Sequence, residues 1–320
     1  MPLYLLLAVL CVGGAPAWVF LSAIADIVTG KTRLWPRTRA VGFFALYLAC
    51  EVFGIFVAAL IWVATLGGHV VGPTGYRDAN AVLQRWWTTA MLRGSAWIFA
   101  NKIEVEGLEL ARSGPLLFFV RHSSTADAVL AAALVTNPNR LLLRYVIKRE
   151  LIWDPCIDIV GGRLPNVFVD RKAARGRAQI DAIARLGKDL DARSAVLIYP
   201  EGTRFSREKL VRSIEALGKR NDEKLAAIAA GFRYVLPPRL GGPLALLNAA
   251  PGVDLVLLEH TGFEGAATFT QFWSGGLVGR TIRVRLRRFT PEMVPATDRD
   301  LWLFERWAEM DAWIAGWHDG

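Results

Sequence analysis

The sequence is poor in cysteine, histidine and charge. It has three cysteines and four histidines in 320 residues, and two of the cysteines, Cys11 and Cys50, lie inside apolar runs. This excludes a disulfide framework and offers no metal-ligand spacing, so we expect neither a metal site nor an oxidising compartment. Charged residues make up only 21% of the chain and hydrophobic residues 53%. That composition excludes intrinsic disorder, a collagen-like chain and a low-complexity scaffold.

The charge that is present is mostly positive, with a formal net charge of +9 and a pI near 9.8. Anionic lipid and nucleic acid would both suit such a chain. Twelve tryptophans favour lipid, because indole is enriched at membrane–water interfaces. The sequence contains no nucleic-acid-binding motif and no isolated basic tail, so no nucleic-acid partner is predicted.

Two long apolar runs, Leu3–Val28 and Ala40–Leu66, open the chain. Each exceeds the roughly 20 residues that a helix needs to cross a bilayer. No Lys or Arg precedes the first run, which argues against a cleaved signal peptide. We therefore predict that residues 1–70 are embedded in the membrane, with buried helices of a soluble protein as the alternative. Glu51 lies inside the second run, where it marks either a function or a carboxyl group that faces a helix partner.

The loop between the runs holds four basic residues, Lys31, Arg33, Arg37 and Arg39. The positive-inside rule assigns this loop to the cytoplasm, which would leave both ends of a two-span hairpin outside. We expect the domain that follows these runs at the cytoplasmic face of the cell membrane. Either the first run re-enters, or the arginines 77, 85 and 93 outweigh the loop.

Residues 71–320 form the predicted second domain, which opens with an amphipathic helix over 81–100. Trp86, Trp87 and Trp97 alternate there with Arg85 and Arg93, as in helices that lie in the membrane interface. Packing against a protein core is the alternative.

From Gly107 onward, short apolar runs alternate with helical patterns, which predicts an α/β fold with a mostly parallel sheet flanked by helices. The expected strands are 115–120, 141–147, 166–169, 195–199 and 253–258. Four of them run directly into polar residues, and ligands of open α/β sheets bind beyond the carboxyl ends of the strands. These segments carry the candidate site residues His122, Asp127, Lys148, Arg171, Glu201, Gly202, Thr203 and Arg204. The cations among them predict an anionic, phosphate-bearing ligand.

His122 and Asp127 are the candidate catalytic pair. They meet if His122 precedes a helix whose first turn contains Asp127, and the carboxylate then fixes the imidazole tautomer for proton transfer. A capping box from Ser124 to Asp127 explains the same spacing without catalysis. Ser123 and Ser124 lack a nucleophile elbow around them, so capping is the favoured role for the serines.

Five segments together resemble the motifs of the glycerophospholipid acyltransferase superfamily, which includes the 1-acylglycerol-3-phosphate acyltransferases. They are RHSSTAD (121–127), KREL with Pro155 (148–155), GRLPNVFVDR (162–171), YPEGTR (199–204) and YVLPPR (234–239). The ordered set spans roughly residues 81–290. Arg121 departs from the pattern, because asparagine commonly precedes the histidine in this family.

The resemblance implies a membrane-bound O-acyltransferase. A fatty acyl group would pass from acyl-CoA or acyl-carrier protein, as co-substrate and without a cofactor, to the hydroxyl of a lysophospholipid, most simply 1-acylglycerol-3-phosphate. His122 would be the base and Asp127 its partner. Lys148, Arg171, Arg204 and Arg239 would hold the acceptor phosphate, with Glu201, Gly202 and Thr203 shaping its pocket. Two alternatives stay open: a non-catalytic lipid-binding protein of this fold, and a glycolipid or amino-acid lipid as acceptor.

Overall fold

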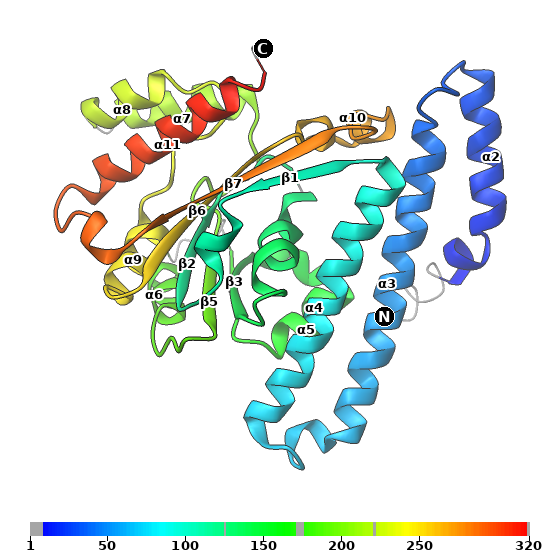
Figure 1. Cartoon of the computed structure of the whole chain (residues 1–320), viewed down its shortest axis with the longest axis horizontal. Helices are drawn as coiled ribbons and strands as arrows, with labels where there is room; N and C mark the ends of the chain where they lie inside the picture. Colours follow the sequence, from blue (N-terminus) through cyan, green and yellow to red (C-terminus); the bar gives the residue numbers. More distant parts are fainter. Residues whose placement is uncertain (1–8, 125, 171–175, 220–221, 319–320) are drawn as a thin grey trace.

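A seven-stranded sheet forms the centre of the computed structural model, which describes residues 9–124, 126–170, 176–219 and 222–318 (Figure 1). The strand order is β1-β7-β6-β2-β5-β3-β4, and every neighbouring pair is parallel except β6 and β7. The predicted mostly parallel sheet is confirmed. The strands are β1 (Lys102–Glu106), β2 (Leu116–Val120), β3 (Leu142–Lys148), β4 (Val167–Val169), β5 (Ser194–Ile198), β6 (Asp254–Thr261) and β7 (Thr281–Phe289).

The central strands are apolar throughout because helices cover both faces of the sheet. Leu117 and Phe119 of β2 belong to one core, whereas Phe118 and Val120 belong to the other, as the two-residue period of a strand requires. The first core contains α6 (Gly176–Leu186), α7 (Arg207–Gly218), α8 (Glu223–Ala230), α9 (Gly241–Ala249) and α11 (Arg299–Ala315). The second contains α4 (Gly72–Phe99) and η4 (Ala132–Thr136).

Strands β1 and β7 at one side of the sheet are absent from the sequence prediction. β7 buries Ile282, Val284 and Leu286 on one face and carries partly buried arginines on the other, so it alternates instead of forming a continuous apolar run. β6 is also longer than predicted and continues to Thr261. Because β7 reverses direction, β1 begins level with the end of β6, with the start of β7 between them: Lys102 pairs with Thr281, and Thr261 pairs with Arg283.

The N-terminal helices form a group beside the sheet. α3 (Pro36–Ala64) and α4 lie antiparallel, with η1 (Leu66–Gly68) in the turn between them, and α2 (Ala15–Val28) packs on the outer side of α3 (Figure 1). Among the described residues, α3 is the single helix long and apolar enough to cross a membrane. α2 has 14 residues, fewer than the roughly 20 of a span. Residues 3–8 of the first predicted span lie outside the described residues.

Two acidic side chains inside the apolar helices are fully buried and hydrogen-bonded. Asp26 of α2 accepts the backbone N–H of Thr38 at 3.0 Å, which satisfies a free donor in the first turn of α3. Glu51 of α3 accepts Nε1 of Trp87 at 2.8 Å and the backbone N–H of Cys156 at 3.1 Å. Cys156 lies in α5 (Pro155–Gly162). Glu51 therefore faces neighbouring helices.

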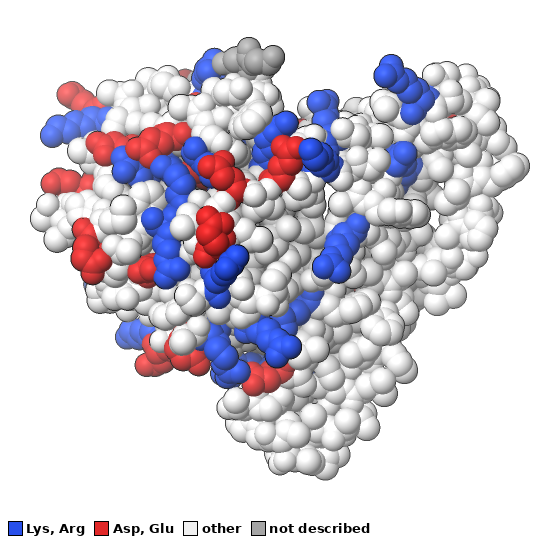
Figure 2. Space-filling model, viewed as in Figure 1, with Lys and Arg blue, Asp and Glu red and all other residues white. Residues whose placement is uncertain are grey.

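Charged side chains are unevenly distributed between the N-terminal helices and the rest of the surface. Figure 2 shows acidic and basic side chains over the sheet and its helices, whereas the part formed by α2, α3 and the lower half of α4 is almost free of them. Basic atoms return near the upper ends of α2 and α3. Exposed apolar side chains on these helices include Trp18, Phe20, Phe56, Trp62 and Trp97.

The tryptophans of α11 mainly pack inward. Trp307 is completely buried, and Trp302 and Trp313 pack partly against the core. The ring of Trp313 lies 4.8 Å from the Arg285 guanidinium, and the ring of Trp317, half exposed, lies 4.1 Å from that of Arg283. This helix covers the arginine-bearing face of β7, which explains its aromatic content without a membrane.

Candidate active site

Four predicted strand-end segments lie along one edge of the sheet, which we term the catalytic edge. β2, β5, β3 and β4 are consecutive and parallel, so their carboxyl ends share that edge. His122 follows β2, Glu201–Arg204 follow β5, and Lys148 ends β3. Arg171, which was expected after β4, lies outside the described residues.

His122 and Asp127 meet at the catalytic edge. Nδ1 of His122 lies 3.0 Å from Oδ1 of Asp127, which stands in the first turn of η3 (Ala126–Val129). The other oxygen, Oδ2, accepts the backbone N–H groups of Ser123 at 2.7 Å and Ser124 at 2.8 Å. Asp127 therefore both closes the start of the helix and binds the imidazole, so the two predicted readings of the spacing are compatible.

This geometry sets the tautomer of His122. An ionised carboxylate only accepts hydrogen bonds, so Nδ1 carries the proton and the lone pair of Nε2 remains for a ligand. The His122 side chain is 18% exposed, and the ring of Tyr199 lies over it at 4.5 Å between centroids. The site thus presents an oriented base at a partly open surface.

The main chain of His122 is held by the segment that follows β5. Its N–H donates to Oε1 of Glu201 at 2.8 Å, and its carbonyl accepts from the N–H of Phe205 at 2.9 Å. Oε2 of Glu201 accepts the N–H of Leu236 at 3.0 Å. Glu201 is 2% exposed, so its carboxyl group does not face solvent. It links its own turn to the segments that contain His122 and Leu236.

Gly202 and Arg239 are also brought together. Gly202 has φ +69°, and a Cβ added there would lie 2.9 Å from Cδ of Arg239. The left-handed backbone and this close approach both call for glycine. The N–H of Arg239 donates to the carbonyl of Pro200 at 2.8 Å, and Thr203 accepts from Nζ of Lys209 at 3.2 Å. These contacts fix the conformation of the turn after β5.

The remaining cations stay near the surface. Lys148 pairs with Glu150 at 3.0 Å, and both side chains are exposed to about four-tenths. Arg204 and Arg239 are exposed. A ligand at the catalytic edge can therefore contact these positively charged side chains directly at the surface.

A family model described as "Acyltransferase" matches residues 102–237. That range contains His122, Asp127, Lys148 and the Glu201–Arg204 turn. This match and the relatives described below support the glycerophospholipid acyltransferase superfamily that the motifs resemble. It is an acyltransferase.

Two relatives bear on this acyltransferase. The lysophosphatidylinositol acyltransferase 10 of Caenorhabditis elegans is 23% identical over 277 residues, which cover 83% of this chain and 68% of the relative. The crystal structure of the 1-acyl-sn-glycerophosphate (LPA) acyltransferase PlsC from Thermotoga maritima is 15% identical. It covers 82% of this chain and 92% of its own, with a TM-score of 0.45.

Arg121, which departs from the acyltransferase motif, is fully buried behind the catalytic pair. Its guanidinium donates to the carbonyls of His260 at 2.6 Å and Tyr234 at 2.8 Å, and to Glu264 at 2.6 Å. Glu264 lies in η6 (Glu264–Ala266). Burial opposes ionisation of Glu264, but the charge of Arg121 outweighs it and lowers the pKa to about 2. The arginine therefore binds protein groups and does not point toward a ligand.

The buried carboxyl groups of the acyltransferase site have opposite electrostatic environments. Burial opposes ionisation of Asp127, but its contacts with His122, His260 and Ser124 hold the pKa below its ordinary value. Burial raises the pKa of Glu201 to about 7, although Arg121 and two backbone N–H groups favour the charged form. Asp127 is thus ready to stabilise an imidazolium, whereas Glu201 gains and loses a proton near neutral pH.

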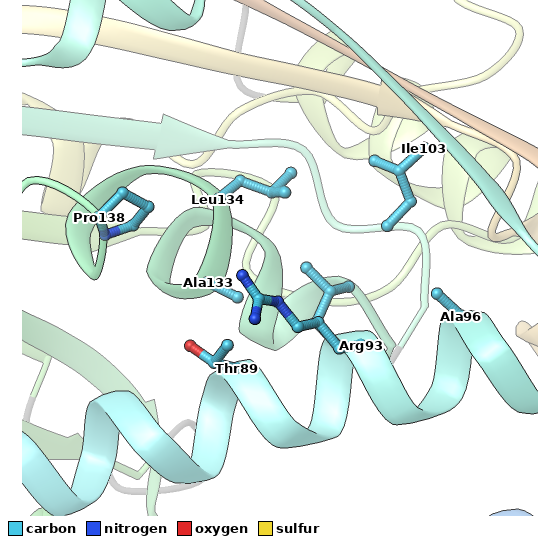
Figure 3. Close-up of a pocket in the computed structure, with 8 residues that line it drawn as sticks. Thr89, Arg93, Ala96, Ile103, Ala133, Leu134 and Pro138 are labelled. Atoms are coloured by element: carbon cyan, nitrogen blue, oxygen red, sulfur yellow. The ribbon is translucent and has the colours of Figure 1, made fainter.

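A separate hollow of about 370 Å³ lies between α4, β1 and the turn around η4. Figure 3 shows Thr89, Arg93 and Ala96 of α4 on one side of this hollow, with Ala133, Leu134 and Ile103 across from them. The lining is mostly apolar, and none of the described residues that line it belongs to the predicted site.

Sequence reasoning missed two side chains beside the catalytic pair, Tyr199 and His260. Tyr199 ends the predicted strand 195–199 and begins the YPEGTR motif, and the sequence predicts no role for its side chain. His260 lies two residues past the predicted end of its strand. It is one of only four histidines in the chain, and this scarcity is the one feature of the sequence that could have pointed to His260 as a candidate site residue.

Proposed function

We propose that this acyltransferase moves a fatty acyl group from a thioester donor, acyl-CoA or acyl-carrier protein, to the free hydroxyl of a lysophospholipid. We propose 1-acylglycerol-3-phosphate as the acceptor and phosphatidic acid as the product. The relatives named above act on a lysophosphatidylinositol and on a 1-acyl-glycerophosphate according to their names. Both acceptors join a phosphate to a glycerol hydroxyl.

The observation that carries the proposal is the His122–Asp127 pair, with Nε2 of the imidazole facing away from the carboxylate. Nε2 removes the proton of the acceptor hydroxyl while its oxygen attacks the thioester carbonyl carbon. The tetrahedral intermediate collapses as the C–S bond breaks, and the imidazolium returns the proton to the departing thiolate. Asp127 stabilises the imidazolium throughout. No covalent acyl-enzyme is needed.

Cations near the catalytic edge suit the acceptor's phosphate. Arg204 follows β5, which is the neighbour of β2, the strand that precedes His122. Arg239 packs on Gly202 of the same turn as Arg204. A planar guanidinium matches two phosphate oxygens. Lys148, at the end of β3, would extend this cationic surface. Arg171, which lies outside the described residues, is proposed to do the same.

The apolar helices supply the acceptor. α4 leads into β1, whose first residue lies level with the end of β6, so the helical hairpin joins the sheet at the catalytic edge. We propose that α3 and α4 hold this edge against the bilayer, with the catalytic domain on its cytoplasmic side.

The test is a panel of acceptors with the purified full-length protein. Lysophosphatidate, other lysophospholipids, a glycolipid and an amino-acid lipid are each offered with acyl-CoA and acyl-carrier protein, and thiol release is measured. We expect turnover with lysophosphatidate and a loss of about 10²–10⁴-fold in His122→Ala. The matched control is His69→Ala, which replaces an exposed histidine in the turn between α3 and α4 and should leave the rate unchanged.

Binding of lysolipid without turnover by the wild-type protein would favour the non-catalytic alternative. Turnover with a neutral acceptor alone would move the acceptor class to glycolipids. A rate in His122→Ala above about a third of wild type would refute the base assignment, because loss of a general base costs at least about 10²-fold.

A further inference from the structure

His260 is a fully buried histidine in contact with the catalytic pair from behind. It is the last residue but one of β6, the strand beside β2, and its side chain has no exposed surface. Nε2 lies 2.9 Å from the carbonyl oxygen of Arg121 and 3.5 Å from Oδ2 of Asp127. Its ring edge meets Phe263 at 5.8 Å between centroids.

The surroundings of His260 define its tautomer. The carbonyl of Arg121 and the carboxylate of Asp127 are both acceptors, so Nε2 must carry the proton to bind either. Among the described residues, Nδ1 has no hydrogen-bond partner, as suits the unprotonated nitrogen. Burial lowers the pKa of His260, although the charge of Asp127 opposes the shift. The ring is therefore a neutral donor aimed at two acceptors.

These acceptors determine where His122 stands. The Arg121 carbonyl and the His122 N–H belong to the same peptide unit. His260 binds the oxygen of that unit at 2.9 Å, and Glu201 binds its N–H at 2.8 Å. The peptide that carries the catalytic base is thus held from both sides. The same Nε2–H also adds positive potential beside Oδ2 of Asp127 and favours its ionised form.

We propose that His260 is a positioning residue for acyl transfer, acting through the Arg121–His122 peptide and through Asp127. The proposal rests on the function proposed above. Under this proposal, three side chains contact one another in series: His122, Asp127 and His260. Only His122 touches the substrate.

The test separates a positioned donor from a core side chain by three substitutions. Gln places its amide nitrogen near the position of Nε2, Asn places it near Nδ1, and Leu removes the donor. We expect kcat to fall by about tenfold or more in His260→Leu and His260→Asn, a fraction of the 10²–10⁴-fold carried by general-base catalysis. KM should change less than about threefold, and His260→Gln should recover most of the lost rate. Phe263→Leu is the matched core control. It should lower the melting temperature and leave kcat little changed.

A double substitution tests the route through Asp127. Asp127→Asn already removes the oriented carboxylate, so adding His260→Leu should cost less than about threefold further. Additive losses, or equal rates in the Gln and Asn variants, would overturn the proposal and leave His260 as core packing. If His260→Leu does not fold, the Gln and Asn contrast decides alone. Full activity in His260→Leu refutes the positioning role only, whereas full activity in His122→Ala refutes the proposed function.

Discussion

Replacing Asp127 by asparagine should stop acyl transfer while leaving the fold in place. Oδ2 of Asp127 accepts two backbone N–H groups, at 2.7 and 2.8 Å, and only the amide oxygen of Asn can take both. The NH₂ group then replaces Oδ1, 3.0 Å from Nδ1 of His122. Since NH₂ is a donor, Nδ1 must become an acceptor and the ring proton moves to Nε2. The base is then blocked.

The alternative orientation of the amide is less favourable. It would aim NH₂ at two buried N–H donors and leave each without a partner, at about 1–3 kcal/mol apiece. The blocked tautomer therefore prevails. We expect a rate loss of about 10²–10⁴-fold, or roughly 3–5 kcal/mol in activation free energy. The melting temperature should change little, because Asn keeps both backbone hydrogen bonds.

Asp127→Ala is the comparison that separates the two tasks of the carboxylate. It loses the imidazole contact and also both backbone contacts, so it should be inactive and less stable by about 2–6 kcal/mol, or 1–3 kcal/mol per unsatisfied N–H. Thiol release from acyl-CoA and thermal unfolding are measured on the same detergent-purified samples. Asp127→Asn activity within tenfold of wild type would refute the tautomer argument. An unchanged melting temperature in Asp127→Ala would refute the structural one.

Three further predictions concern the acceptor, the buried ion pair and the membrane surface. Arg204→Ala should raise KM for a phosphate-bearing acceptor about tenfold, and Arg204→Lys should recover only part of it because the fork is lost; unchanged KM in both would refute phosphate binding. Burial opposes ionisation of Glu264, yet Arg121 lowers its pKa from 4.5 to about 2. Its stabilisation is thus complete above pH 4.5 and lost as the pH falls toward 2, so the difference in melting temperature between wild type and Glu264→Gln should shrink only in acid. Trp97 and Trp153 are 83% and 91% exposed, and replacing both by Ala should weaken flotation with anionic liposomes; undiminished flotation would exclude them from the lipid contact.

The central strands could be predicted from the sequence because both faces of each are covered, which makes them continuous apolar runs. β2 and β5 are fully buried. β7 could have been found by its alternation of Ile, Val and Leu with Arg, a signal that a search for continuous apolar runs does not use. β1, with the sequence KIEVE, pairs only with β7, and its short mixed pattern gives little evidence by itself.

The contact between His122 and Asp127 could be predicted because the two residues follow a strand end directly and have the spacing for it. The supporting contacts could not. Glu201 binds His122 and Leu236 across separations of 79 and 35 residues, and His260 binds Arg121 across 139. Such pairs depend on the strand order, which local patterns do not encode. The position of Arg121 could not be predicted either, because its guanidinium lies completely buried among acceptors that come from distant parts of the chain.

The reversed pair β6–β7 has an energetic consequence for substrate delivery. Because β1 begins at the catalytic edge, the helical hairpin and His122 approach the bilayer together under the proposed function. A lysolipid can then reach Nε2 by lateral diffusion with its chain still among other chains. At about 0.8 kcal/mol per CH₂, withdrawing roughly 16 carbons into water would cost on the order of 13 kcal/mol. Because β7 runs antiparallel to β6, the lysolipid can reach the site by diffusion within the leaflet, and its chain need not be transferred into water.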